Sequence, residues 1–325
     1  MNRRFFPIRK NYSKGNRNRE RKGKGLILIQ IDGLSFEHYK QASDHNKLPF
    51  LTKLSQKFGY EVVPMYSGLP STTPAVQAEL FYGIKGAVPA FSFVDSNTNR
   101  LGKMYDPEFA SLIQKRLEQN SDNLLNDGGA YSNIYSGGAK HSQFCPGSFN
   151  WNQSVPNLGW LRSLLLCLKY PLNLCRIVSL LLIESVLSIS DVIRGILERK
   201  DFAKELKFIP SRVMICILLR ELTTYFAIRD INRQLPIIHL NYLGYDEQAH
   251  RRGPSSRFAY WSLKGIDKSI SKLWRVTQKT TSRDYSIWIY SDHGQEEVDS
   301  YFSIHGRSVE EAITEVLGEE IIVDP

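Results

Sequence analysis

The sequence of 325 residues has few cysteines and no long hydrophobic run. Its four cysteines, Cys145, Cys167, Cys175 and Cys216, show neither CxxC pairing nor regular spacing. We therefore expect small buried side chains in a reducing compartment rather than metal ligands or disulfides. The most apolar stretch, residues 161–189, is interrupted by charged residues and a proline. A transmembrane helix needs about 18 uninterrupted apolar residues, so none is predicted.

A signal peptide is not predicted either. The first apolar run, Leu26–Ile31, is shorter than the roughly 7–15 residues of a signal-peptide core, and Asp32 ends it. We therefore expect a cytoplasmic protein, which would be peripheral to a membrane if another segment binds lipid.

The net charge of +9 comes from the N-terminus alone. Residues 1–24 hold ten Lys and Arg against a single Glu, which leaves 32 basic and 32 acidic side chains in residues 25–325. This composition predicts a solvated, disordered tail. An anionic membrane surface is the alternative partner, because basic tails are attracted to charged lipid. Nucleic-acid binding is not expected, since the neutral remainder lacks a basic-aromatic recognition motif.

Three apolar or β-branched runs predict buried strands, and each leads directly into polar residues. Residues 26–31 lead into Asp32-Gly33, residues 237–242 into Gly244-Tyr245-Asp246, and residues 285–290 into Ser291-Asp292-His293-Gly294. Continuous apolar runs are typical of strands that are covered on both faces. Ligands of open α/β sheets collect at the carboxyl ends of such strands. The acidic residues therefore predict one shared site.

The fold expected from these runs is a single α/β domain over residues 25–325. It has a largely parallel central sheet with helices on both faces and a helical insertion at about residues 96–235, between the two halves of the sheet.

Apolar residues at helical spacing predict the helices of this insertion, within residues 161–181 and again from Val213 to about Ile228. Ser211 is the candidate cap of the last one. A bundle packed on the sheet and a Leu-rich lid at a membrane surface both fit these helices. Residues 122–157 are rich in Gly, Ser and Asn and predict a long loop.

Asp246 and His250 are the first candidate metal ligands. Their spacing of four places a carboxylate and an imidazole on one helix face, which suits a zinc half-site and is also common in surface pairs. Asp292 and His293 follow the third strand, where adjacent side chains point in opposite directions. One loop can thus serve two metal ions about 4 Å apart, as in two-metal enzymes.

Two further candidate ligands follow from the strand ends and from the interval to His293. Asp32 adds a carboxylate at the end of the first strand, and Gly33 leaves the backbone free to turn sharply. His305, twelve residues after His293, can supply a third imidazole.

A candidate nucleophile lies in Pro70-Ser71-Thr72-Thr73-Pro74. Pro74 fits the first position of a helix that ends before Gly83, which makes Thr73 the predicted N-cap. A hydroxyl there lies among free N–H groups at the positive end of the helix dipole, where phosphate binds. Threonine is a poor nucleophile at its free pKa, but a bound metal ion can supply the alkoxide.

In this order, the motifs resemble the alkaline phosphatase superfamily, most closely its type I phosphodiesterase/nucleotide pyrophosphatase family. The resemblance covers about residues 25–95 and 235–306. It implies an alkaline-phosphatase-like fold and two divalent metal ions, with Zn²⁺ expected and Mn²⁺ or Mg²⁺ as alternatives. It also implies the ligands of each ion: Asp32, Thr73, Asp292 and His293 for one, and Asp246, His250 and His305 for the other.

Three positions depart from the family pattern. Pro74-Ala75-Val76 follows the threonine where Phe-Pro-Asn is usual, and Gln295 occupies the usual position of a Met. His305 lies closer to the Asp-His-Gly motif than the last His of nucleotide pyrophosphatases, and this interval is similar to that of the mutase branch.

The resemblance implies a metal-dependent phosphoric ester hydrolase of the phosphodiesterase/nucleotide pyrophosphatase type, with Thr73 as its catalytic residue. The partner would be a phosphate-ester small molecule or a lipid headgroup. The alternatives are a phosphomonoesterase or phosphomutase of the same superfamily, and a non-catalytic, membrane-peripheral metal-binding module. The oligomeric state is not predicted.

Overall fold

The computed structural model describes residues 23–119, 121–148, 213–299 and 301–318, with short pieces between residues 178 and 189. The tail up to residue 22, Ser211, two of the cysteines and most of the predicted insertion helices lie outside the described residues. Cys145 and Cys216 are described, and both are buried free thiols.

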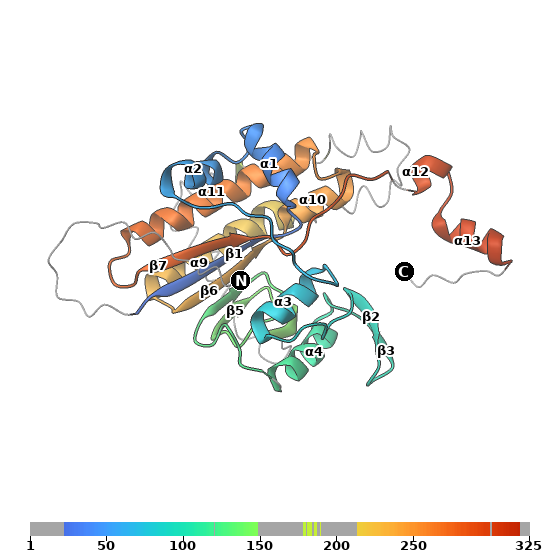
Figure 1. Cartoon of the computed structure of the whole chain (residues 1–325), viewed down its shortest axis with the longest axis horizontal. Helices are drawn as coiled ribbons and strands as arrows, with labels where there is room; N and C mark the ends of the chain where they lie inside the picture. Colours follow the sequence, from blue (N-terminus) through green and yellow to red (C-terminus); the bar gives the residue numbers. More distant parts are fainter. Residues whose placement is uncertain are drawn as a thin grey trace, which may run out of the picture.

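A five-stranded parallel sheet forms the centre of the molecule and confirms the predicted α/β class (Figure 1). Its strand order is β5-β4-β6-β1-β7. The three predicted strands are β1 (Gly25–Ile31), β6 (Ile237–Tyr242) and β7 (Tyr285–Tyr290). β1 pairs with both of the others, and the register sets Gln30 beside Asn241 and Tyr290. The carboxyl ends of all three strands therefore meet at one edge of the sheet.

The sheet also extends into residues for which a loop was predicted. β4 (Gly129–Tyr131) and β5 (His141–Gln143) form its far side, so the loop prediction for residues 122–157 is wrong there. The segment 96–235 is accordingly not helical throughout. Strands of three residues are too short to show an alternating pattern. Gly128, just before β4, is explained by close packing and not by a loop, because a Cβ at this position would lie 2.4 Å from the Ile237 carbonyl oxygen.

Helices cover both faces of the sheet (Figure 1). One face carries α1 (Phe36–Asp44), α2 (Pro49–Phe58), α9 (Arg220–Arg233), α10 (Gly244–Arg252) and α11 (Arg257–Lys279). The other face carries α3 (Thr73–Tyr82) and α4 (Pro107–Gln119). Side chains of β1 point alternately to the two faces of the sheet. Ile27, Ile29 and Ile31 belong to the hydrophobic core under the first group of helices, whereas Gln30 faces α3 on the other side.

The remaining elements lie at the margins. The helix predicted from Val213 is a π-helical turn, η2 (Met214–Leu219), that continues into α9. β2 (Ser92–Asp95) and β3 (Arg100–Lys103) form a separate antiparallel hairpin, and η1 (Pro146–Ser148) is a single 3₁₀ turn. After β7, α12 (Tyr301–His305) and α13 (Val309–Leu317) lie apart from the sheet in Figure 1. Among the described residues, no helix combines the length and apolar character that a membrane span requires.

A buried carboxylate of α11 caps α2 from outside the helix. The N-cap residue of α2, Leu48, has no side-chain acceptor, and Asp267 accepts the N–H groups of Phe50 and Leu51 at 2.8–3.1 Å.

We predict that Asp267→Ala lowers the free energy of unfolding by about 2 kcal/mol, because these N–H groups lose their acceptor. Urea unfolding measures the loss. Lys268→Ala, at the exposed next position, is the control, and equal losses in both variants would contradict the capping role.

Candidate active site

The candidate site begins with Asp32, immediately after β1. This side chain is only 2 % exposed. Its Oδ2 accepts a hydrogen bond of 2.6 Å from Asn241 Nδ2 on β6, and its Oδ1 lies 3.2 Å from His293 Nε2 beyond β7. Asp32 thus connects the ends of the three central strands.

A second carboxylate, Asp246 in the first turn of α10, lies against Gly33. Gly33 has φ +71°, and a Cβ there would lie 2.2 Å from Asp246 Oδ1. Asp246 Oδ1 is 3.9 Å from His293 Nε2 and accepts a hydrogen bond from Gln295, while its Oδ2 is 3.3 Å from His250 Nε2. The glycine is therefore required both for the turn and for the space that Asp246 occupies.

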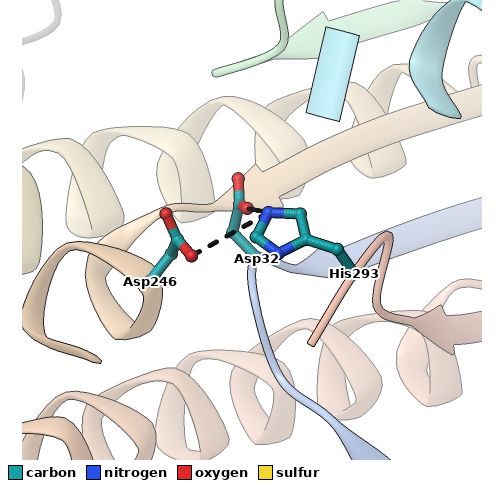
Figure 2. Close-up of side chains that lie close together, drawn as sticks. All are labelled: Asp32, Asp246 and His293. Carbon is teal, nitrogen blue, oxygen red and sulfur yellow. Dashed lines mark ion pairs between the residues drawn. The ribbon is translucent and has the colours of Figure 1, made fainter. Parts of the chain in front are cut away.

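Asp32, Asp246 and His293 point toward one another from separate elements (Figure 2). One potential ligand atom from each lies within 4.8 Å of the others. Carboxylate oxygens and an imidazole nitrogen form a donor set that suits Zn²⁺ or Mn²⁺. Within the described part of the chain, this is the group of three side chains that could hold a metal ion.

Asp292 adds an unsatisfied carboxylate to this group. It is fully buried, and within the described residues neither of its oxygens has a hydrogen-bond partner. Its Oδ2 lies 3.8 Å from His293 Nε2. Burial and the charge of Asp32 raise the pKa of Asp292 to about 7, and burial also raises the pKa of Asp32. Three crowded carboxylates beside one imidazole fit a site for a divalent cation.

The same carboxylates stabilise the protonated form of His293. Burial disfavours its charged form, but the carboxylates of Asp32, Asp292 and Asp246 outweigh burial and raise the pKa of His293 to about 10. In the metal-free protein the ring is therefore protonated at neutral pH, and a metal ion that binds its nitrogen must displace a proton.

The N-terminus of α3 places a hydroxyl group beside these carboxylates. Thr73 Oγ1 donates a hydrogen bond of 3.3 Å to Asp32 Oδ1 and lies 3.5 Å from His293 Nε2. The N-cap is Thr72 rather than the predicted Thr73, and Pro74 accordingly lies one position further into the helix. A proline is accepted at either position, because neither N–H has a partner within the helix. α3 ends just before Gly83, as predicted, and Gly83 itself has the left-handed conformation.

Buried polar side chains beneath the site fix α3 against β1, and sequence analysis did not identify them. Gln77 Nε2 donates to Gln30 Oε1 at 2.9 Å, and the Tyr290 hydroxyl donates to the same oxygen at 3.3 Å. His239 Nε2 lies 2.7 Å from that hydroxyl. The signal in the sequence was a Gln, His or Asn inside an otherwise apolar strand.

Ser291 joins the two loops that carry Asp32 and His293. Its Oγ accepts the N–H of Leu34 at 2.9 Å and donates to the carbonyl oxygen of His293 at 2.8 Å. The turn after β7 is thereby held against the turn after β1.

The two remaining predicted ligands lie further from the buried group. The His250 side chain is 68 % exposed and contacts Asp246, whose hydrogen bond raises the pKa of this imidazole. His305 is exposed on α12, where its ring centroid is 4.3 Å from that of Tyr301, and it is not part of the group around His293. Metal binding by either histidine stays a prediction.

Residues 196–319 match the model of the type I phosphodiesterase / nucleotide pyrophosphatase family. The predicted resemblance to this family is confirmed. The description of this family agrees with the expected enzyme class, a hydrolase acting on phosphoric ester bonds. The matched segment contains Asp246, His250, Asp292 and His293, whereas Asp32 and Thr73 precede it.

No match was found among curated proteins. Among solved structures, phosphonoacetate hydrolase from Sinorhizobium meliloti 1021, in complex with phosphonoacetate, is similar to this chain at 12 % identity and a TM-score of 0.49. The alignment covers 91 % of this chain and 63 % of that one, so the chain spans less than two thirds of that protein.

The close approach at Gly33 gives a test of the metal site. We predict that Gly33→Ala weakens the binding of Mn²⁺ at least about tenfold, because the new methyl group displaces Asp246 and removes a ligand. Isothermal titration calorimetry measures the affinity. Gly59→Ala is a matched control, since Gly59 has φ +72° but nothing within 4 Å of a new Cβ. Affinities reduced equally in both variants would show backbone strain rather than loss of Asp246.

The raised pKa of His293 gives a second test, on the metal-free protein. Because its pKa is about 10 in the folded state and 6.5 ordinarily, its contribution to stability is complete below pH 6.5 and is lost as pH rises toward 10. We predict that the difference in stability between the wild type and His293→Gln shrinks over this range. Thermal unfolding with a chelator present measures it, and a difference that grows with pH would exclude the charged imidazole.

Proposed function

We propose that this chain hydrolyses phosphoric diesters with Thr73 as the nucleophile and two divalent metal ions at the strand ends. The observation that carries the proposal is the position of Thr73 Oγ1, 3.3 Å from Asp32 Oδ1 and 3.5 Å from His293 Nε2. A hydroxyl group surrounded by metal-ligating side chains at a helix N-terminus suits attack on phosphorus. The description of the matching family supports a diester or pyrophosphate bond as the target.

The chemistry of the donor set supports the metal ions. Asp32, Asp292 and His293 would hold one ion together with Thr73, and Asp246 and His250 would contribute to the other, with His305 as its predicted third ligand. Zinc is the expected ion. Bound metal ions lower the pKa of a hydroxyl group and neutralise phosphoryl oxygens.

The residues of the chain would act as follows. Asp32 accepts the hydrogen bond of the Thr73 hydroxyl and so orients its oxygen. This oxygen bonds to phosphorus as the bond to the alcohol breaks in line, and the alcohol leaves with a proton. Water then hydrolyses the phosphothreonine and restores the hydroxyl group. Because Asp32, Asp292 and Thr73 are buried, the substrate would approach from the exposed side, near His250.

Substitution of Thr73 tests the nucleophile. We predict that Thr73→Ala lowers kcat on bis(p-nitrophenyl) phosphate at least about a thousandfold without loss of bound metal, because the attacking oxygen is absent. Thr73→Ser keeps the hydroxyl group and should retain measurable turnover. Release of p-nitrophenol and metal analysis by mass spectrometry give the two readouts.

Thr72→Ala is the matched control, since this neighbouring hydroxyl is also buried but has no hydrogen-bond partner among the described residues. Full activity of Thr73→Ala, or an equal loss in Thr72→Ala, would remove Thr73 from the mechanism.

Parallel assays on p-nitrophenyl phosphate decide between diester and monoester, and we expect the higher kcat/KM on the diester.

A further inference from the structure

The segment that precedes the nucleophile exposes large apolar side chains. We call residues 62–69 the apolar segment. Its members Val62, Val63, Met65, Tyr66 and Leu69 are 42–83 % exposed, with Tyr66 and Leu69 above 80 %. Between Glu61 and Glu79 the chain carries no charged residue. Contiguous exposed apolar surface in a folded protein is typical of a binding surface.

A tight turn holds the apolar segment near Thr73. The hydroxyl oxygens of Ser67 and Ser71 are 2.9 Å apart, and the N–H of Thr72 donates to the Pro70 carbonyl oxygen at 3.0 Å. Ser67 is thereby brought beside Ser71, two residues before the nucleophile. Leu69 precedes Thr73 by four residues, so their Cα atoms are at most about 14 Å apart. An extended alkyl group joined to a phosphate at Thr73 is therefore long enough to reach Leu69, the last residue of the apolar segment.

The lack of charge indicates which group would bind there. A nucleotide or nucleic-acid leaving group carries further phosphates, which proteins contact with Lys and Arg. The apolar segment offers no such side chain, and what it offers instead is aliphatic and aromatic surface. Burial of an alkyl chain against this surface would be favourable, because it removes apolar area from water on both sides.

We infer that the apolar segment binds an alkyl or acyl chain of the substrate, so that the substrate class is a phosphoric diester with an apolar alcohol. This inference rests on the proposed function. The ligand of the apolar segment is the chain of a single substrate molecule rather than the surface of a bilayer.

A chain-length series tests the inference. The probes are methyl, butyl and octyl p-nitrophenyl phosphate diesters, each held below its critical micelle concentration. For the wild type we expect kcat/KM to rise about two- to fourfold per added methylene, the range between partial and full burial. Tyr66→Ser combined with Leu69→Ser should reduce the octyl-to-methyl ratio at least about tenfold. Val316→Ser, on α13 and 82 % exposed, should keep the wild-type ratio.

A second readout separates this inference from the proposed function. Binding of methyl-, butyl- and octylphosphonate to the metal-loaded protein, measured by calorimetry, requires no turnover. If no diester is cleaved but phosphonate affinity rises with chain length and falls in the double variant, the proposed function fails and the apolar subsite stands. A flat series in the wild type, or a series unchanged by the double variant, overturns the inference. So does a chain-length preference that emerges only above the critical micelle concentration, because a surface would then be recognised.

Discussion

Repulsion among the carboxylates at the strand ends is the constraint on which the rest of the site depends. Asp32, Asp246 and Asp292 converge there, and the first and last of these are almost completely buried. In the metal-free chain, His293 is the cation that compensates them, which explains the direction of its pKa shift. Buried like charges persist only where a counter-charge is available. The arrangement is therefore better suited to holding cations than to stabilising the fold.

The polar face of the sheet shows how this unfavourable group is kept in place. Gln30 on β1 and Asp32, the residue just after β1, are two positions apart and bind Gln77 and Thr73, which are four positions apart on α3. Two residues span about 6.6 Å along a strand and four residues span about 6 Å along a helix, so the two repeats match. The Gln30–Gln77 hydrogen bond thus sets the register that delivers the Thr73 hydroxyl to Asp32. Helix and strand geometry, rather than loop packing, positions the candidate nucleophile.

Sequence patterns predicted those parts of the site that strong local signals determine. Long apolar runs that end at acidic residues, such as Leu26–Ile31 before Asp32, predicted the three central strands. They also predicted that the acidic residues after these strands share one site. β4 and β5 escaped prediction because strands of three residues depend on pairing with neighbouring strands, β4 with β6 and β5 with β4, and not on their own periodicity. The start of α3 was misplaced by one residue, since a proline fits the first or the second helical position equally well.

The supporting side chains could not be derived from the sequence for a different reason. Asn241 is the hydrogen-bond donor to Asp32 only because β6 lies beside β1 in a parallel register. That neighbourhood is a property of strand order, which local patterns do not encode. A polar residue inside an apolar strand indicates that some buried partner exists, because an unsatisfied buried amide is costly, but it does not indicate which one.

The two halves of the candidate metal centre differ in how far they are organised before any ligand binds. Asp32, Asp292 and Thr73 are at most 8 % exposed. A hydrogen bond that Asn241 donates to Asp32 and one that Ser291 accepts from Leu34 fix the loops around them. His250, by contrast, is largely exposed and contacts only Asp246 within the group. An ion bound between Asp32 and His293 would find ligands already in position, whereas an ion at Asp246 and His250 would have to order an exposed imidazole and lose its rotamer entropy. The buried half should therefore bind its ion more tightly. The exposed half, on the side open to substrate, would still need its predicted third ligand, His305, or an oxygen of the substrate phosphate.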